Sequence, residues 1–178
     1  MAITGGGNYL EDLRPGDVFV HGRGRTVSEL DNYLVTLMTL NTAQAHFNRD
    51  YMARMLEGAY RERLVMGAVT MAICIGLSSE DLSENAIAEL GYTAIAFPAP
   101  VFHGDTLYAE TEVLAVEEAD RPDAGIVRCR VTGRKQDGST VFVGERTLLV
   151  KRRSHWGERD RQFLRSRLPR ELQDWGED

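Results

Sequence analysis

The sequence predicts an α+β fold in which an antiparallel sheet wraps around one buried helix, and three observations carry this prediction. The first is an apolar run of fourteen residues at positions 64–77. The second is the series of strand-like segments that fills the chain after Asn85. The third is the pair Asp137-Gly138 between the last two of these segments, which is a strong hairpin signal. A helix that is apolar on all sides has to be enclosed, and a curved sheet is the simplest enclosure.

The elements before the buried helix begin with a turn at residues 13–17, which leads into a strand at 18–27. Ser28 and Asp31 then have the spacing of a capping box, which predicts a helix start. Four apolar residues fall on one face of that helix, namely Leu30, Leu34, Leu37 and Met38. The helix should fade near Asn41, and a polar, irregular overhang follows to residue 63, with a helical stretch around 49–56.

The buried helix contains small residues that would let surrounding backbone approach closely, namely Gly67, Ala68, Ala72 and Gly76. After it come four strand-like segments, at 90–97, 106–116, 126–133 and 141–150, and apolar and polar residues alternate with the period of a strand in the second and third of them. We therefore expect the order strand, helix, overhang, buried helix and four strands in a meander.

Length and charge limit the classes of protein to consider. The chain has 178 residues and a net charge of −6, which argues against a nucleic-acid surface and does not favour an anionic membrane, so neither partner is expected. Its longest apolar run is shorter than the roughly 20 residues of a membrane span, and no signal peptide is recognisable. Cys74 and Cys129 lie in apolar or alternating runs, as reduced core cysteines do. We expect a soluble, cytoplasmic protein.

The chain divides by composition into a main domain at residues 1–152 and a charged appendage at 153–178. Residues 151–178 carry 8 Lys and Arg against 6 Asp and Glu, whereas the preceding 150 residues are strongly acidic. We expect a short helix around 160–168 whose Phe163 and Leu164 dock on another surface. A solvated, charged tail is an equally good interpretation.

His46 is the histidine that the sequence singles out for chemistry. It follows the end of the first helix and lies among polar groups between two apolar segments. An imidazole titrates near neutral pH and can act as a general base, although a single histidine is more often a surface or packed residue. The sequence contains no metal-binding motif, phosphate-binding glycine loop or nucleophile elbow.

Three segments carry a resemblance to a known family. Asn41 and His46 stand five residues apart, the spacing of the family's hydration motif. Residues 63–67, Arg-Leu-Val-Met-Gly, are similar to the entry into its central helix, and residues 100–107, Pro-Val-Phe-His-Gly-Asp-Thr-Leu, to its strand signature. On these residues the chain resembles the MaoC-like hydratase/dehydratase family, which has the hotdog fold. Further segments, at 24–32, 85–92, 125–128 and 136–138, are similar to its mesaconyl-CoA, β-methylmalyl-CoA and itaconyl-CoA hydratase branch.

The resemblance implies an enoyl-CoA hydratase or dehydratase for short branched or dicarboxylyl thioesters. It also implies that the chain forms homodimers or larger homo-oligomers built from dimers. His46 would be the general base, and Asn41 would orient the water or the imidazole. Gly67 would offer a backbone N–H to the thioester oxygen. Gln44, Arg63 and Arg25, together with Arg61, are the candidates for contacts to the substrate or to the CoA phosphates. No metal or separate cofactor is implied, because coenzyme A is part of the substrate.

Two departures from the family pattern keep alternatives open. Asn41 stands where the R-specific enzymes carry Asp, and Ala43-Gln44 replaces Asn-Pro. An acyl-CoA-binding subunit without catalysis is therefore one alternative. A thioesterase on the same fold is a weaker one, because such enzymes usually need a carboxylate near the thioester.

Overall fold

The structure is a computed structural model that describes residues 7–60 and 62–169 of the chain. Its strands are β1 (Val18–Val20), β2 (Arg25–Thr26), β3 (Ala86–Ala96), β4 (Thr106–Glu118), β5 (Ala124–Lys135) and β6 (Thr140–Lys151). Its helices are α1 (Glu29–Met38), α2 (Arg49–Arg54), α3 (Gly67–Leu77) and α4 (Arg153–Ser166). Short helical turns are η1 (Leu10–Asp12), η2 (Gln44–His46), η3 (Met55–Gly58) and η4 (Ser79–Ser83). The predicted α+β class is confirmed.

All the strands join one antiparallel sheet, in the spatial order β1, β4, β5, β6, β3, with β2 also paired to β4. The segments β4, β5 and β6 form a meander, and Gly138 turns the last hairpin with a φ of 84°. The predicted meander of four strands is wrong, because β3 pairs with β6 at the far edge and does not neighbour β4. Alternation of apolar residues shows which face of a strand is buried, and it carries no information about which strand is its neighbour.

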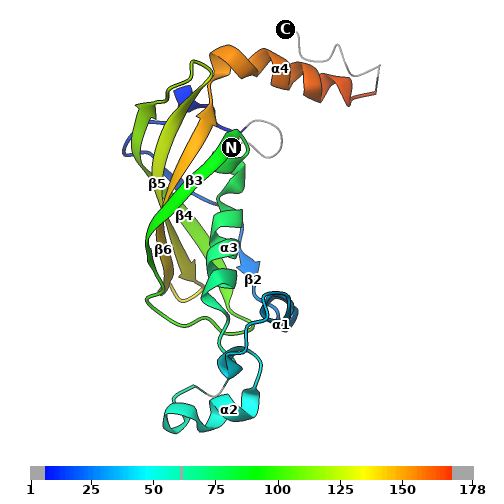
Figure 1. Ribbon diagram of the computed structural model, residues 1–178, viewed down its shortest axis with the longest axis vertical. Coiled ribbons are helices and arrows are strands. Elements are labelled where there is room, and N and C mark those ends of the chain that lie inside the picture. Colours follow the sequence, from blue (N-terminus) through cyan, green and yellow to red (C-terminus); the bar gives the residue numbers. More distant parts are fainter. Residues whose placement is uncertain (1–6, 61, 170–178) are drawn as a thin grey trace.

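Helix α3 lies along the concave side of the sheet (Figure 1) and packs closely on it. Val69, Thr70 and Cys74 are its buried residues. A Cβ on Gly133 of β5 would collide with the Cys74 sulfur, so glycine at this position lets the helix approach the strand. The core between them continues through buried residues such as Leu107 and Phe142.

The prediction that this helix is enclosed on all sides is wrong for the single chain. Ala68, Ala72 and Gly76, which are spaced four residues apart, form an exposed stripe on α3. The helix also begins three residues later than the apolar run, because Leu64 forms an isolated bridge with Phe102 of the opposite segment. Small side chains lose little when they stay exposed, so an apolar run containing them does not require enclosure by its own chain.

The predicted first strand is interrupted after Val20. Residues between β1 and β2 leave the regular ladder, although the His21 N–H still donates to the Ala109 carbonyl at 3.1 Å. A Cβ on Gly24 would lie 2.5 Å from the Tyr108 ring, so the chain passes close to β4 here. The interruption places the imidazole of His21 in the protein interior, where the side chain is 2% exposed.

Helix α1 has the predicted capping box, in which the Ser28 N–H donates to Asp31 at 2.8 Å and the Asp31 N–H donates to Ser28 at 3.3 Å. Its faces are reversed with respect to an ordinary amphipathic helix. Asn32 and Thr36 are buried, whereas the apolar face is exposed at Leu30, Leu34, Leu37 and Met38. The polar residues of α1 therefore face the molecule, and their contacts become important below.

A Schellman-type turn ends α1 and sets the start of the overhang. Leu40 has a φ of 52°, its N–H donates to the Leu37 carbonyl, and the Asn41 N–H donates to the Thr36 carbonyl at 3.0 Å. In a Schellman turn the residue with positive φ is usually glycine, so Leu40 adopts a conformation that most side chains avoid. The helix thus ends at the place predicted, and the side chain of Asn41 turns back toward the molecule.

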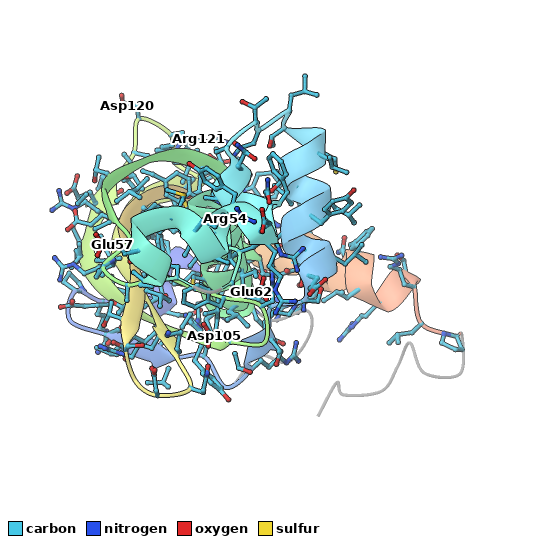
Figure 2. The ribbon with its side chains drawn as sticks, turned by 90° about the horizontal axis from the view of Figure 1, so that it is seen from below. Arg54, Glu57, Glu62, Asp105, Asp120 and Arg121 are labelled. Atoms are coloured by element: carbon cyan, nitrogen blue, oxygen red, sulfur yellow. The ribbon has the colours of Figure 1, made fainter. Side chains whose placement is uncertain are left out.

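The overhang and the appendage extend the fold at its two ends (Figure 1). Helix α2 confirms the helical stretch predicted near 49–56. Seen from below, it lies across the end of the sheet, and Glu62 lies on the side nearer α1 (Figure 2). Helix α4 starts earlier than the predicted 160–168 and is held by Trp156, whose Nε1 donates to the Asp123 carbonyl at 3.0 Å. No helix within the described residues is both long and apolar enough to cross a membrane.

Candidate active site

His46 ends the short turn η2 and has one ring nitrogen committed and one free. Its Nδ1 lies 3.0 Å from the carbonyl oxygen of Leu64. Because a carbonyl only accepts hydrogen bonds, Nδ1 carries a proton, and in the neutral ring the lone pair then lies on Nε2. Among the described residues, Nε2 has no hydrogen-bond partner. This is the tautomer that a general base needs, and the hydrogen bond from Nδ1 to the Leu64 carbonyl fixes the orientation of the ring.

The half-buried His46 borders a cavity of about 430 Å³ between the overhang, the start of α3 and the segment after β3. The walls are largely apolar. They comprise His46, Tyr60, Leu64, Val65, Gly67, Thr70, Phe97, Pro98, Ala99, Pro100, Val101 and Val141. None of these lining residues is Asp, Glu, Lys or Arg. Apolar surroundings strengthen the electrostatic interactions of any charge that develops next to the imidazole.

Gly67 lines the same cavity and is the first residue of α3. Its N–H has no acceptor within the helix, since the first N–H groups of a helix lack intrahelical partners. The positive end of the helix dipole lies at this position as well. A Cβ here would meet the ring of Phe97 at 3.2 Å, so glycine keeps the backbone accessible beside the aromatic wall. The structure thus brings together two predicted site residues, His46 and Gly67.

Asn41 lies outside the cavity wall and acts on the loop that carries His46. Its Oδ1 accepts from the Ala43 N–H at 2.9 Å, and the His46 N–H donates to the Ala43 carbonyl at 3.1 Å. Its Nδ2 lies 3.0 Å from the sulfur of Met66, the residue before Gly67. These contacts fit an orienting residue, and the Asn41 amide is not itself a titratable group.

The other predicted contacts to the substrate are occupied by protein partners. Gln44 is exposed, and its Oε1 accepts from Asn48 at 2.6 Å. Arg25 pairs with Asp31 at 2.7 Å, and Arg63 pairs with Glu29 at 2.8 Å. None of the three lines the cavity, so their contact with a substrate stays a prediction. Arg61 lies outside the described residues.

The sequence did not identify Asn32, Tyr60 or Thr70, although all three belong to the surroundings of His46. Tyr60 and Thr70 line the cavity, and the Tyr60 ring lies 6.0 Å from the ring of Phe102. Asn32 is 1% exposed and donates to the His46 carbonyl at 3.0 Å. The sequence gives little indication of this role, because Asn32 lies on the face of α1 opposite the leucines. A polar residue is expected on that face of a surface helix.

Other potentially reactive groups of the described residues are unsuited to catalysis. Burial raises the pKa of Cys74 to about 12 and that of Cys129 to about 11, so neither thiol ionises near neutral pH. Within the described residues, no group of three or more His, Cys, Asp or Glu side chains could hold a metal ion. Of the two titratable residues that line the cavity, His46 and Tyr60, the imidazole is the one suited to act as a base near neutral pH.

Comparisons with known proteins identify the family and the fold. The family model described as mesaconyl-CoA hydratase matches residues 10–152. The mesaconyl-CoA hydratase of Cereibacter sphaeroides is 32% identical over 152 residues, which are 84% of this chain and 43% of that protein. The crystal structure of a MaoC-domain protein dehydratase from Chloroflexus aurantiacus superposes with a TM-score of 0.79 at 28% identity, over 86% of this chain and 43% of that one.

A third similarity concerns the fold. A Mycobacterium tuberculosis protein described as a double hotdog superposes with a TM-score of 0.75 at 24% identity, and the match covers 84% of this chain but 46% of that protein. The chain likewise spans less than half the length of the mesaconyl-CoA hydratases that it matches. The match thus corresponds to about one half of these longer proteins.

Proposed function

Because the chain belongs to the mesaconyl-CoA hydratase family of MaoC-like hotdog proteins, we propose that it is a hydro-lyase acting on an α,β-unsaturated acyl-CoA thioester. Its substrates would be short branched or dicarboxylyl groups of the mesaconyl and methylmalyl type, as the names of its relatives suggest. The observation that carries the proposal is the shared cavity of His46 and Gly67, in which the imidazole keeps a free Nε2.

The proposed hydration uses the two residues in turn. The Nε2 of His46 takes a proton from water while the water oxygen attacks the β-carbon, and the electron pair of the double bond moves toward the thioester oxygen. The Gly67 N–H and the α3 dipole stabilise the resulting enolate oxygen. His46 then returns its proton to the α-carbon, so that one water is added and the imidazole is neutral again. The reverse sequence gives dehydration.

The remaining polar groups have supporting parts in this proposal. Asn41 holds the loop of His46 through Ala43, and it cannot itself act as the base because an amide does not titrate usefully. The steps need no cofactor besides the CoA of the substrate, since every proton comes from water or His46. A reducing cytoplasmic location belongs to the same proposal, with support from two unpaired, buried cysteines.

The test is an absorbance assay of the enoyl thioester with crotonyl-, mesaconyl- and itaconyl-CoA, run beside an assay for free thiol. Loss of absorbance without release of thiol is the expected result. Release of thiol would replace the proposal with a thioesterase. Tight binding of acyl-CoA with neither change would identify a binding subunit, the alternative that the substitution of Asn41 for an acid keeps open.

We also propose that two copies of the chain pair, and surfaces left open in the protomer support this. The stripe of Ala68, Ala72 and Gly76 on α3 is exposed, and so are Ile87 and Leu90 on the edge strand β3. An unpaired edge strand offers hydrogen-bonding groups to a second strand. The similar double hotdog protein has about twice the length covered by this chain, which is the size that two copies would reproduce.

Light scattering tests the pairing, and a mass of twice the 19.9 kDa chain is expected at micromolar concentration. Ala72→Arg places a long charged side chain on the open stripe of α3 and should shift the protein toward the monomer. A matched change on an exposed position of the appendage, Arg159→Ala, should leave the dimer unchanged. A wild-type chain that stays monomeric would refute the pairing without touching the assignment of His46.

A further inference from the structure

Asn32 lies in the middle of α1 with 1% of its surface exposed, and its amide is fully engaged. Its Oδ1 accepts from the Met66 N–H at 2.9 Å. Its Nδ2 donates to the carbonyl oxygens of His46, at 3.0 Å, and of Leu64, at 3.1 Å. Backbone N–H groups only donate and carbonyls only accept, so these partners settle which atom of the amide is nitrogen and which is oxygen.

The Leu64 carbonyl is shared between Asn32 and the ring of His46. The same oxygen receives Nδ2 of Asn32 at 3.1 Å and Nδ1 of His46 at 3.0 Å, which uses its two lone pairs. The acceptor that fixes the tautomer of the imidazole is thus itself held in place by Asn32. A second hydrogen bond from the same amide holds the backbone of His46.

The third partner connects Asn32 to the other half of the site. Met66 is the N-cap residue of α3 and directly precedes Gly67. One buried side chain therefore ties α1 to the segment of the base and to the start of the helix that faces the thioester. We propose that Asn32 is the positioning residue of this site, which sets the tautomer of His46 and its placement relative to Gly67. The inference rests on the proposed hydratase function.

His103 borders this arrangement and is compatible with it in the neutral form. Its Nε2 lies 3.3 Å from Nδ2 of Asn32, and its Nδ1 is buried without a hydrogen-bond partner among the described residues. Burial, followed by the charge of Arg63, lowers the pKa of His103, with Glu29 and Glu62 acting in the opposite direction. A protonated His103 ring would direct an N–H toward the N–H groups of Asn32. The neutral ring therefore leaves the three hydrogen bonds of Asn32 to Met66, His46 and Leu64 intact.

Asn32→Asp is the sharpest test, because the new side chain is isosteric and changes its donors with pH. One oxygen can still accept from the Met66 N–H, while the other faces two carbonyls and must carry a proton to be compatible with them. Burial favours that protonated form. As the pH rises the carboxyl ionises, the last donor is lost, and kcat should fall along an alkaline limb that the wild type lacks. KM should change little, because Asn32 does not line the cavity.

The tautomer of His46 is read separately from activity, by long-range ¹⁵N–¹H correlation of the imidazole. In the wild type the proton is expected on Nδ1, and in Asn32→Asp at alkaline pH a substantial fraction should move to Nε2. Loss of one or two ordinary hydrogen bonds corresponds to about a 5–30-fold change in rate, and this is the expected fall in kcat. If the Asp variant does not fold, Asn32→Ser takes its place for the tautomer and kcat measurements, because its short side chain cannot reach all three partners, although it adds no titratable group.

Thr36→Val is the matched control. Thr36 is the other buried polar residue of α1, equally 1% exposed, and its hydroxyl has no hydrogen-bond partner among the described residues. This variant should keep kcat, the pH profile and the tautomer of the wild type. If the Asn32 variants lower only thermal stability and leave the tautomer of His46 and the pH profile unchanged, the inference is overturned. If the wild type lacks hydratase activity, the proposed function fails, whereas the tautomer measurement still decides the role of Asn32.

Discussion

His21 is buried and His46 is half-buried in this fold, and the chemical difference between them lies in how many ring nitrogens remain available. His21 has its Nδ1 2.6 Å from Asp81 and its Nε2 2.8 Å from the hydroxyl of Thr111. His46 uses Nδ1 alone, on the Leu64 carbonyl. A histidine beside a carboxylate resembles a catalytic pair at first sight, yet His21 has no lone pair or proton left to offer a substrate.

The cavities give the same lesson. His21 borders a space of about 540 Å³ between β1 and the end of α3, larger than the 430 Å³ beside His46. Size does not make it the better site, because its imidazole is saturated and Thr111 is fully buried. The free nitrogen next to a helix N-terminus is the feature that distinguishes a reactive site from a structural hydrogen-bond network.

The largest expected effect is the loss of activity in His46→Ala. Removal of the general base should lower kcat by about 10²–10⁴. Stability should change little, since the ring makes one hydrogen bond to a carbonyl that Asn32 still engages. The measurement is kcat on the best enoyl-CoA together with urea unfolding. A folded His46→Ala enzyme with wild-type activity would refute the assignment of the site.

His21→Leu should show the opposite pattern and is the next largest effect. It keeps the approximate volume and leaves the buried hydroxyl of Thr111 and the carboxylate of Asp81 without their partner. Leaving such groups unpaired costs about 1–3 kcal/mol. The midpoint of urea unfolding should fall while kcat per folded molecule stays the same. A selective loss of kcat would mean that the two histidines are more alike than their hydrogen bonds indicate.

Asn41→Ala should have an intermediate effect on activity, smaller than that of His46→Ala. It removes the hydrogen bond to the Ala43 N–H that shapes the turn before His46. One such bond is worth about 1 kcal/mol, which corresponds to about a fivefold fall in kcat/KM. Asn41→Asp keeps this bond and adds a charge that favours the imidazolium, so its pH optimum should move upward. The pH profiles of kcat/KM for the two variants test both statements.

His103 gives the smallest effect, on the dependence of stability on pH. Its pKa is lowered in the folded protein below the ordinary value near 6.5. Below that value the unfolded chain binds more protons than the folded one, so stability is lost as the pH falls from about 6.5 toward the lower folded pKa. His103→Gln should flatten this acidic decline in urea midpoints measured between pH 7 and pH 5. An unchanged slope would show that His103 is not the group that titrates.

The fold class, the capping box and the hairpin could be predicted because each depends on residues close in sequence. Ser28 and Asp31 are three positions apart, and Asp137-Gly138 forms its own turn. The position of β3 beside β6 and the open stripe of α3 could not, because both depend on contacts between distant segments. Periodicity also favours leucines over Asn32 as the buried face of α1, and the structure has the reverse.

The candidate site was predictable in part for the same reason. The polar neighbours of His46 single it out in the sequence, whereas its pairing with Asn41 and the role of Gly67 are what the family resemblance implies. The partner that fixes the imidazole is a backbone carbonyl, which has no signature in a sequence. The amide that holds this carbonyl lies 32 positions away in the chain. Only the folded structure brings these groups together.

Since a carbonyl of the main chain holds the proton on Nδ1, the identity of the side chain at position 64 has no part in that task. The Leu64 N–H donates to the Ala45 carbonyl at 3.0 Å. Proline is excluded at this position, because it has no backbone N–H to make this hydrogen bond. Evolution can therefore vary the shape of the cavity wall at this position without disturbing the chemistry of the base. In a saturation library, position 64 should be a place where substrate preference drifts while the reaction itself persists.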